Sequence, residues 1–437
     1  MQMSRTLCLL LLVMVTWALG TVGPRVASAE DYSFDIEEFE KKPLTWGGYA
    51  ELKAEHNRIN TDGAFALLNY YDHPRSELDR LTTTLQLDGN YHVEIVDFNW
   101  LLQTYSSFSQ VDDEEDLNIF SAYTSIKPTP SMTFELGKKT FKWGKGYAWN
   151  PVGFIDRPKD PNNPEDALEG YIGGAVDLIK SFPGKLQTVA LTTVLLPVWD
   201  NVNEDFGERD NLNLAAKLYL LYADTDIDFI LFTGNSRSTR FGLDLSKNLK
   251  TNFEVHAELA YIPEQKRLAL DASGTPYSTR ESIFSYLLGL RYLSENDITT
   301  ILEYYHNDAG YSEEQMERFY RRVDEAHANY LATGDDSLLR SVREISEKGY
   351  AKPQAGRNYL YLRTTQKEPF DILYFTPGVT AIVNLDDSSY TVSPEAVYTG
   401  ITDWEFRLRY SHSVGERYSE QGEKANESKL ELRLRYY

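Results

Sequence analysis

Hydrophobic and polar residues alternate along several long stretches of the chain. In residues 81–95, 250–261 and 404–411, the side chain at every second position is mostly apolar, and the intervening side chains are mostly polar or charged. A period of two places successive side chains on opposite faces, so each stretch predicts a β-strand with one apolar and one polar face. The longer stretches exceed the ~5–6 residues usual for soluble sheets and suit the ~9–11 residues that a tilted strand needs to cross a bilayer.

This period predicts about eighteen strands, with sixteen as the alternative. The alternative arises because proline removes a hydrogen bond from a β-ladder, and two of the strands contain Pro377 and Pro394. The expected strands are 45–56, 80–95, 99–110, 117–127, 131–142, 170–181, 185–196, 211–223, 226–235, 238–247, 250–262, 281–293, 297–308, 357–365, 370–383, 388–399, 403–413 and 428–437.

The connections between the expected strands sort into two sets by length. Every second connection is short and rich in turn residues, as at 127–130 and 182–184. The other set holds all the long ones: 57–79, 143–169, 197–210, 263–280, 309–356 and 414–427. This sorting is typical of outer-membrane barrels, whose short turns lie in the periplasm. We therefore predict an all-β fold, a transmembrane antiparallel up-and-down β-barrel over residues 45–437.

The N-terminal residues follow a different pattern. Arg5 precedes an apolar run at 7–19, and a small-residue stretch ends at Ala27-Ser28-Ala29. This order predicts a cleaved secretory signal peptide at 1–29, because the apolar run is shorter than the ~20 residues of a membrane-spanning helix. Residues 30–44 would then form a periplasmic segment that precedes the barrel.

Composition excludes several functional classes. The only cysteine, Cys8, lies in the predicted signal peptide, so the exported chain would hold no disulfide, thiolate zinc site or covalently attached haem. The whole chain has a net charge of −22, and loss of the signal peptide with Arg5 and Arg25 would leave −24. A protein with this negative charge is a poor partner for nucleic acid. No later stretch is apolar enough to predict a transmembrane helix.

The last expected strand has a distinctive end. Leu430, Leu432, Leu434 and Tyr436 alternate with charged residues, and the chain stops at Tyr437. This resembles the aromatic-ended terminal strand of bacterial outer-membrane proteins, although the apolar set falls on Tyr436. Over residues 45–437 the chain resembles a porin-like β-barrel, without matching a characterised porin residue by residue. The resemblance implies a Gram-negative outer-membrane location, contact with outer-membrane lipid and the assembly machinery, and transport of ions or small hydrophilic solutes.

The connection 143–169 is the third on the long-loop side. In porins this loop often folds into the barrel, so the resemblance implies a pore constriction here. Four prolines stiffen the loop, and its Trp and Tyr residues can pack against a wall. An ordinary rigid surface loop is the alternative. The expected constriction residues are Asp156, Arg157, Lys159, Asp160, Glu165 and Asp166.

A second group of charges lies on the polar faces of the terminal strands. If the barrel closes, the first strand lies beside the last, and the strand at 403–413 comes next. The expected lumen-wall residues are Glu51, Lys53, Glu405, Arg407, Arg409, Glu431, Arg433 and Arg435. An arginine-rich wall opposite an acidic loop would screen solutes by charge, and a salt lattice that holds the wall together is the alternative. From the loop carboxylates we expect a mild cation preference.

Residues 312–348 break the strand pattern. Apolar residues recur there at helical spacing, Ser312 with Gln315 resembles a capping box, and Gly334 separates two short helices. They belong to the expected extracellular loop 309–356, where they would form a lid, a docking site for a partner or a passive surface feature.

Catalysis and cofactor binding find no support in the sequence. The histidines are scattered without a Ser-His-acid set, and metal-ligand spacing is absent, so we predict no enzyme, no cofactor and no metal site. Two functions remain. One is a channel for passive diffusion. The other is a sleeve that encloses a protein partner for electron transfer or secretion, because an eighteen-stranded barrel is wide enough for a plug.

Overall fold

The computed structural model describes residues 43–271 and 274–437. The predicted signal peptide, 1–29, lies outside these residues, as does all but the end of the segment 30–44. Strand β1 begins at Leu44.

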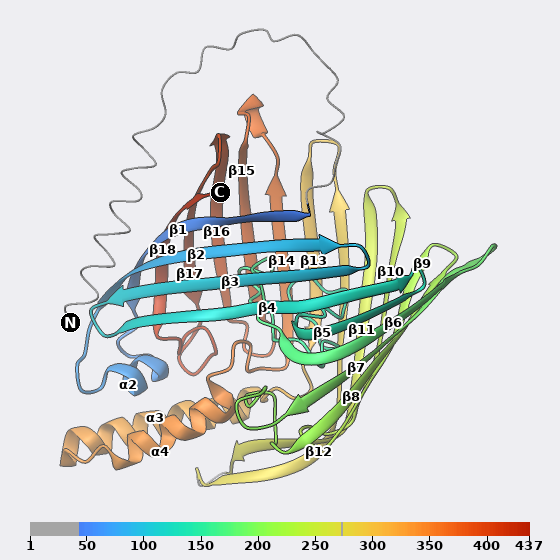
Figure 1. The fold of residues 1–437 in the computed structure, drawn as a ribbon. Helices are drawn as coiled ribbons and strands as arrows, with labels where there is room; N and C mark the ends of the chain where they lie inside the picture. Colours follow the sequence, from blue (N-terminus) through green and yellow to red (C-terminus); the bar gives the residue numbers. More distant parts are fainter. Residues whose placement is uncertain (1–42, 272–273) are drawn as a thin grey trace. The chain divides into compact units, whose positions relative to one another are not determined.

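The described residues form one closed antiparallel sheet (Figure 1). Each strand pairs with the next along the chain, and β1 pairs with both β2 and β18, which closes the sheet into a barrel. The predicted eighteen-stranded up-and-down barrel is thus confirmed. The strands are β1 (Leu44–Ile59), β2 (Glu77–Val93), β3 (Val96–Ser109), β4 (Asp113–Thr129), β5 (Met132–Lys139), β6 (Tyr171–Ser181), β7 (Leu186–Val198), β8 (Asn211–Tyr222), β9 (Thr225–Thr233), β10 (Arg240–Lys250), β11 (Phe253–Leu270), β12 (Pro276–Leu293), β13 (Ile298–His306), β14 (Asn358–Gln366), β15 (Phe375–Asn384), β16 (Tyr390–Ile401), β17 (Trp404–Val414) and β18 (Asn426–Tyr436).

The two proline-containing strands both form. Pro377 lies in β15 and Pro394 in β16, and the two strands pair with each other across both prolines. The alternative of sixteen strands is therefore wrong.

One expected loop is largely strand. Most of the segment 263–280 belongs to β11 and β12, which continue to Leu270 and restart at Pro276. The ladder shifts register between Ile262 and Gln265, on either side of Pro263. A bulge tolerates a proline that a regular ladder would not, so the strand resumes where the sequence suggested its end.

The barrel exposes apolar residues on its outward face and encloses charged residues on its inward face, the reverse of a soluble protein. On β17 and β18, Leu408 and Leu432 are 49% and 44% exposed on the outward face, whereas Arg409 and Glu431 are buried on the inward face. Apolar side chains outside and charged ones inside are the arrangement of a barrel that has lipid around it and water within.

The helices lie in the long connections. The structure has α2 (Ala64–Tyr70), α3 (Glu313–Thr333) and α4 (Ser337–Ile345), followed by a π-helix (Ser346–Tyr350), with a 3-10 helix (Pro369–Asp371) before β15. The capping box of Ser312 with Gln315 and the break at Gly334 are as expected. Helix α2 was not predicted; it shares an apolar core with α3 and α4. Among the described residues, no helix is long and apolar enough to cross a membrane.

Candidate lumen site

The connection between β5 and β6, residues 140–170, packs along the inside of the barrel. Its Trp143, Val152, Phe154 and Ile155 are buried against inward side chains of β6 to β9. We call this part of the barrel the covered wall. Its residues are Tyr171, Ala175, Val194, Leu196, Ala215, Ile230 and Phe232.

Glu258 of β11 holds the first part of this loop by its backbone. The amides of Lys145 and Gly146 donate to Glu258 Oε1 at 2.6 Å each, and the amide of Val152 donates to Oε2 at 3.3 Å. Glycine permits this approach: a Cβ on Gly146 would lie 2.1 Å from the Trp149 carbonyl oxygen. The sequence Gly144-Lys145-Gly146 therefore brings the backbone close to a carboxylate.

Glu303 of β13 holds the next two residues. The amides of Tyr147 and Ala148 donate to its two carboxylate oxygens, the second at 2.8 Å. His256 Nε2 lies 2.8 Å from Glu303 Oε1. Because Glu303 and His256 are almost completely buried, this acid is held by directed hydrogen bonds rather than by water.

Lys145 makes a third attachment. Its ammonium lies 2.9 Å from Asp228 Oδ2 of β9 and 3.8 Å from Asp244 Oδ1 of β10. The two aspartates face each other across the ladder and are buried, so the lysine is the cation that both share. A buried carboxylate needs such a partner, because an unpaired charge in the interior is strongly destabilising.

Asp156, an expected constriction residue, has a structural role that the sequence did not reveal. Its carboxylate accepts the amides of Phe141, Lys142 and Trp143 at 2.8–2.9 Å, and the residue is 7% exposed. Burial raises the pKa of Asp156, while these three hydrogen bonds lower it. Asp156 shapes the start of the loop and does not face the lumen.

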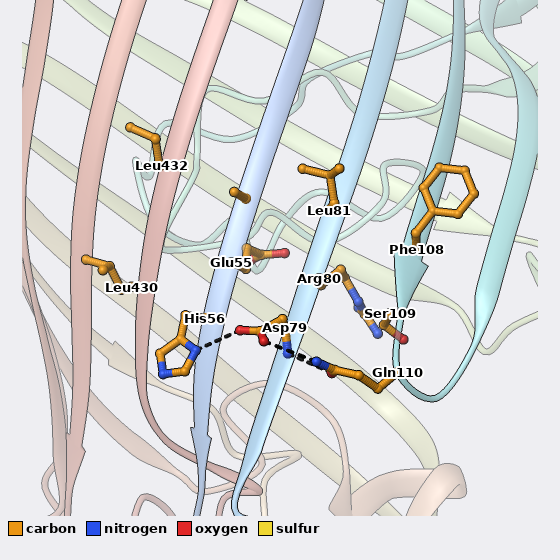
Figure 2. A pocket seen from close by; sticks show the side chains of 11 residues that line it. Glu55, His56, Asp79, Arg80, Leu81, Phe108, Ser109, Gln110, Leu430 and Leu432 are labelled. Atoms are coloured by element: carbon orange, nitrogen blue, oxygen red, sulfur yellow. Dashed lines mark hydrogen bonds and ion pairs between the residues drawn. The ribbon is translucent and has the colours of Figure 1, made fainter. Parts of the chain in front are cut away.

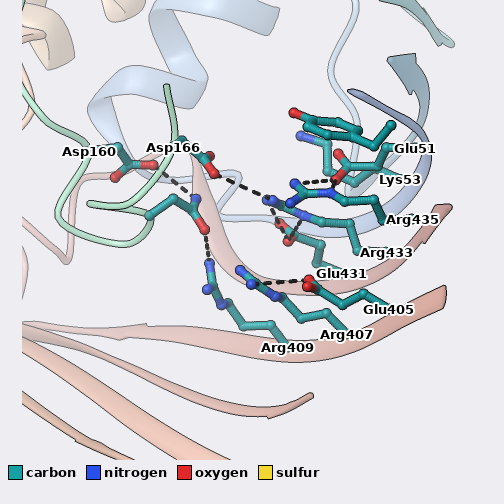
Figure 3. A network of polar contacts seen from close by, with 12 residues as sticks. Glu51, Lys53, Asp160, Asp166, Glu405, Arg407, Arg409, Glu431, Arg433 and Arg435 are labelled. Carbon is teal, nitrogen blue, oxygen red and sulfur yellow. Dashed lines mark hydrogen bonds and ion pairs between the residues drawn. The ribbon is translucent and has the colours of Figure 1, made fainter. Parts of the chain in front are cut away.

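The second half of the loop reaches the strands that carry the expected lumen wall (Figure 3). Asn163 Oδ1 accepts from Arg409 Nη1 at 2.7 Å, and Asp166 lies 4.0 Å from Arg433. Glu165 lies 3.1 Å from Arg363 of β14. Partial desolvation inside the barrel raises the pKa of Asp166, and the nearby Arg433 and Arg435 lower it. Glu165 and Asp166 keep solvent-exposed side chains at this contact.

The other three expected loop charges go elsewhere. Arg157 pairs with Glu169 at 3.0 Å and with Asp205 of the β7–β8 connection. Lys159 is largely enclosed and donates to the Gly146 carbonyl, and burial lowers its pKa against the pull of nearby carboxylates. Asp160 is exposed and accepts from the amide of Asn162 within its own turn.

The structure brings the expected lumen-wall residues together on three adjacent strands. Register places Glu51 beside Arg435, Lys53 beside Arg433, and Glu405 beside Arg435. We call these residues the charged wall: Glu51, Lys53, Glu405, Arg407, Arg409, Glu431, Arg433 and Arg435. Ion pairs run through it, namely Glu51–Arg435 at 2.7 Å, Glu431–Arg433 at 3.0 Å and Glu405–Arg407 at 3.3 Å. The salt lattice thus exists alongside the exposed loop carboxylates.

A cavity of about 830 Å³ remains between the loop and strands β12 to β14. Five basic and two acidic residues line it: Lys142, Lys145, Lys159, Arg291, Arg363, Glu165 and Asp166. Within the described part of the chain, Lys142 and Arg291 form no ion pair. Basic residues therefore outnumber acidic ones in the lining of this cavity, although the chain as a whole is acidic.

A second, shallower cavity of about 490 Å³ lies on the outward face of β1 to β3 and β18 (Figure 2). Leu81, Phe108 and Leu432 line it beside a polar group, in which His56 Nδ1 lies 2.7 Å from Asp79 Oδ1. The Asp79 carboxylate also accepts from Gln110 at 3.1 Å. This group marks the end of the outward apolar surface of β1.

No local pattern in the sequence pointed directly to the residues that anchor the loop. Glu258 and Glu303 occupy polar positions of alternating strands, as many exposed glutamates would. A weaker signal was present in the second halves of β7 and β9, where residues 194–198 and 229–232 are apolar on both faces. Two apolar faces mean that something covers the inner one.

Comparisons with known proteins agree with the barrel. No known family profile matches the sequence, and no curated protein is similar to it. Among solved structures, a BenF-like porin from Pseudomonas fluorescens Pf-5 aligns with a TM-score of 0.52 at 11% identity, over 90% of this chain and 98% of that one. Pseudomonas aeruginosa OccK2 (OpdF), solved with glucuronate, gives a TM-score of 0.49 at 13% identity over 89% and 95%. A triple mutant of the Rhodopseudomonas blastica porin gives 0.44 at 10% over 90% and 99%. At such identities the likeness concerns architecture: the chain has the fold of the bacterial porins.

Proposed function

We propose that this chain is an outer-membrane channel for passive diffusion of small hydrophilic solutes or ions. The observation that carries the proposal is the closed barrel with an apolar outward face and a polar, partly open interior. On β1, ten residue-to-residue steps lead from the outward Trp46 to the outward His56. At ~3.3 Å per residue and a tilt of ~40°, they rise about 25 Å, the height of the apolar band of an outer-membrane barrel.

The inner loop supports a channel over a sleeve. Residues 143–156 occupy part of the lumen and are fixed to Glu258 and Glu303. A sleeve would need that volume for its partner, whereas a channel needs only a narrower passage. The loop's approach to Arg409 and Arg433 favours a constriction between the loop and the charged wall.

The cavity favours anions at this constriction. The cation preference expected from sequence depended on four loop carboxylates, and Asp156 is committed to the loop backbone. Lys142 and Arg291, without ion pairs among the described residues, face the exposed Glu165 and Asp166 across the cavity. Charges at a narrow point act at short range and are weakly screened, so we now infer a mild anion preference.

Swelling of liposomes that contain the purified protein tests the proposal. Uptake of small neutral and anionic solutes, with exclusion of large ones, is the expected result. No uptake by folded, inserted protein would contradict it and favour the sleeve. For sidedness, a tag inserted near Gly334 should be labelled on intact cells; labelling only after permeabilisation would reverse the assignment of the long loops to the outside.

A further inference from the structure

The attachments of residues 143–152 share one chemical feature. Its polar anchors on the barrel wall are carboxylates: the buried Glu258 and Glu303 accept five backbone amides, Asp228 pairs with Lys145, and Glu254 accepts from the Tyr147 hydroxyl. Hydrogen bonds to an ionised acceptor are roughly twice as strong as those between neutral groups. Beside the apolar packing of the loop on the covered wall, its polar attachment therefore depends on the charge state of a few wall acids.

We propose that Glu258 and Glu303 are positioning residues that keep the loop inside the lumen, and that protonation of Glu258 in acid releases the loop and widens the passage. The proposal rests on the proposed channel function. A neutral carboxyl is a weaker acceptor, and its own proton would point toward amide donors that already fill the site. Loss of one anchor would therefore leave buried amides without an acceptor and release the loop residues that Glu258 and Glu303 bind.

The surroundings rank the two anchors. Glu258 has Lys159 of the loop, Asp244 of β10 and Tyr305 of β13 near it. Glu303 has His256, Lys159 and Tyr361 near it. His256 Nε2 lies 2.8 Å from Glu303 Oε1, so Glu303 has a side-chain partner in addition to the two loop amides. Lys159 is a charged partner common to both acids, so Glu258 is the anchor that acid weakens first.

Single-channel recording across pH tests this with Glu258→Gln, Glu303→Gln and the matched control Glu135→Gln. Glu135 is an inward glutamate of β5 that pairs with Lys139 and is not among the anchors. We expect wild-type conductance to rise on the order of twofold between about pH 7 and about pH 4, where glutamates protonate. Glu258→Gln should already show the higher conductance and noise at pH 7 and lose most of the acid response, while Glu135→Gln behaves as wild type.

A loop-side variant keeps the test valid if a wall variant fails to fold. Gly146→Ala leaves every wall charge in place, but its Cβ collides with the Trp149 carbonyl, so it should also raise conductance at pH 7. If Glu258→Gln and Gly146→Ala both have the same conductance as the wild-type protein, the loop is not anchored in this way and the proposal is overturned. A conductance in wild type that is flat with pH would overturn acid release. Absence of any wild-type current would instead contradict the channel function itself.

Discussion

The covered wall and the charged wall belong to the same sheet but present opposite chemistry to the lumen. On the covered wall, inward side chains such as Val194 and Phe232 are apolar and have no exposed surface. On the charged wall, inward side chains such as Glu51 and Arg435 are ionised and paired. The strands do not cause the difference, since both sets have the same outward apolar face. The first half of the loop 143–169 packs on the covered wall, whereas the charged wall is joined by ion pairs and meets the loop only through polar contacts such as Asn163–Arg409.

The contrast shows how to interpret alternation in a barrel strand. A period of two reports that the two faces meet different environments, and it weakens where both faces are dry. The second half of strand β9, Phe229–Phe232, is continuously apolar because lipid lies outside and the loop lies inside. An inward loop can thus be inferred from strands that lack a polar face, even when the loop sequence itself is ambiguous.

The largest expected effect separates the two walls directly. Val194→Lys would bury an unpaired ammonium under the loop and should destabilise the barrel by about 5 kcal/mol. Thr84→Lys, on the inward face of β2 opposite Glu51, should be tolerated, because the new charge meets water and an acid. Urea unfolding in lipid vesicles measures both. Equal cost would mean that the loop does not seal the covered wall.

A smaller loss of stability is expected from a substitution at Asp156, which holds the start of the loop. Asp156→Ala leaves three buried amides without their acceptor, which should cost about 3 kcal/mol and loosen the loop. Asp160→Ala is the control, since that exposed carboxylate accepts only within its own turn. The same unfolding assay, with limited trypsin digestion at the loop lysines, compares them. An Asp156→Ala protein as stable and resistant as Asp160→Ala would contradict the structural role.

Substitutions on the outward face of the barrel should change its stability independently of the covered wall and the charged wall. Leu408→Arg should destabilise the barrel by about 2–4 kcal/mol, the range for arginine near the bilayer midplane. Arg407→Gln, one residue away on the inward face, should be much milder, because it removes a single ion pair with Glu405. Reversal of this order would show that the faces are assigned wrongly.

The smallest effect concerns ion selectivity. Glu165→Gln combined with Asp166→Asn should shift the reversal potential toward anions, since both carboxylates line the cavity. The control pair Asp113→Asn with Glu114→Gln removes the same charge from exposed positions on β4, where salt screens charges beyond about 8 Å. An equal shift of the reversal potential from both pairs would contradict a constriction at Glu165 and Asp166.

Local sequence signals predicted the barrel well and its interior poorly. The alternation at 404–413 and the Ser312–Gln315 capping box depend on residues close in sequence, so both were readable. The roles of Glu258 and Asp156 depend on backbone amides: those that meet Glu258 lie more than a hundred residues away, and those that meet Asp156 turn back on it within the loop. An acidic residue in a sequence does not reveal whether its partner is water, a cation or a buried amide.

Substituted-cysteine modification during current recording tests most directly whether solutes pass along the charged wall. Residues 30–437 contain no cysteine, so each introduced thiol is the only reactive one. With Thr84→Cys, on the inward face of β2 beside Glu51 of the charged wall, a bulky charged thiol reagent should reduce the current. With Ala215→Cys, which is 1% exposed beneath the loop, the reagent should have no effect. Block at Ala215→Cys with none at Thr84→Cys would contradict the account.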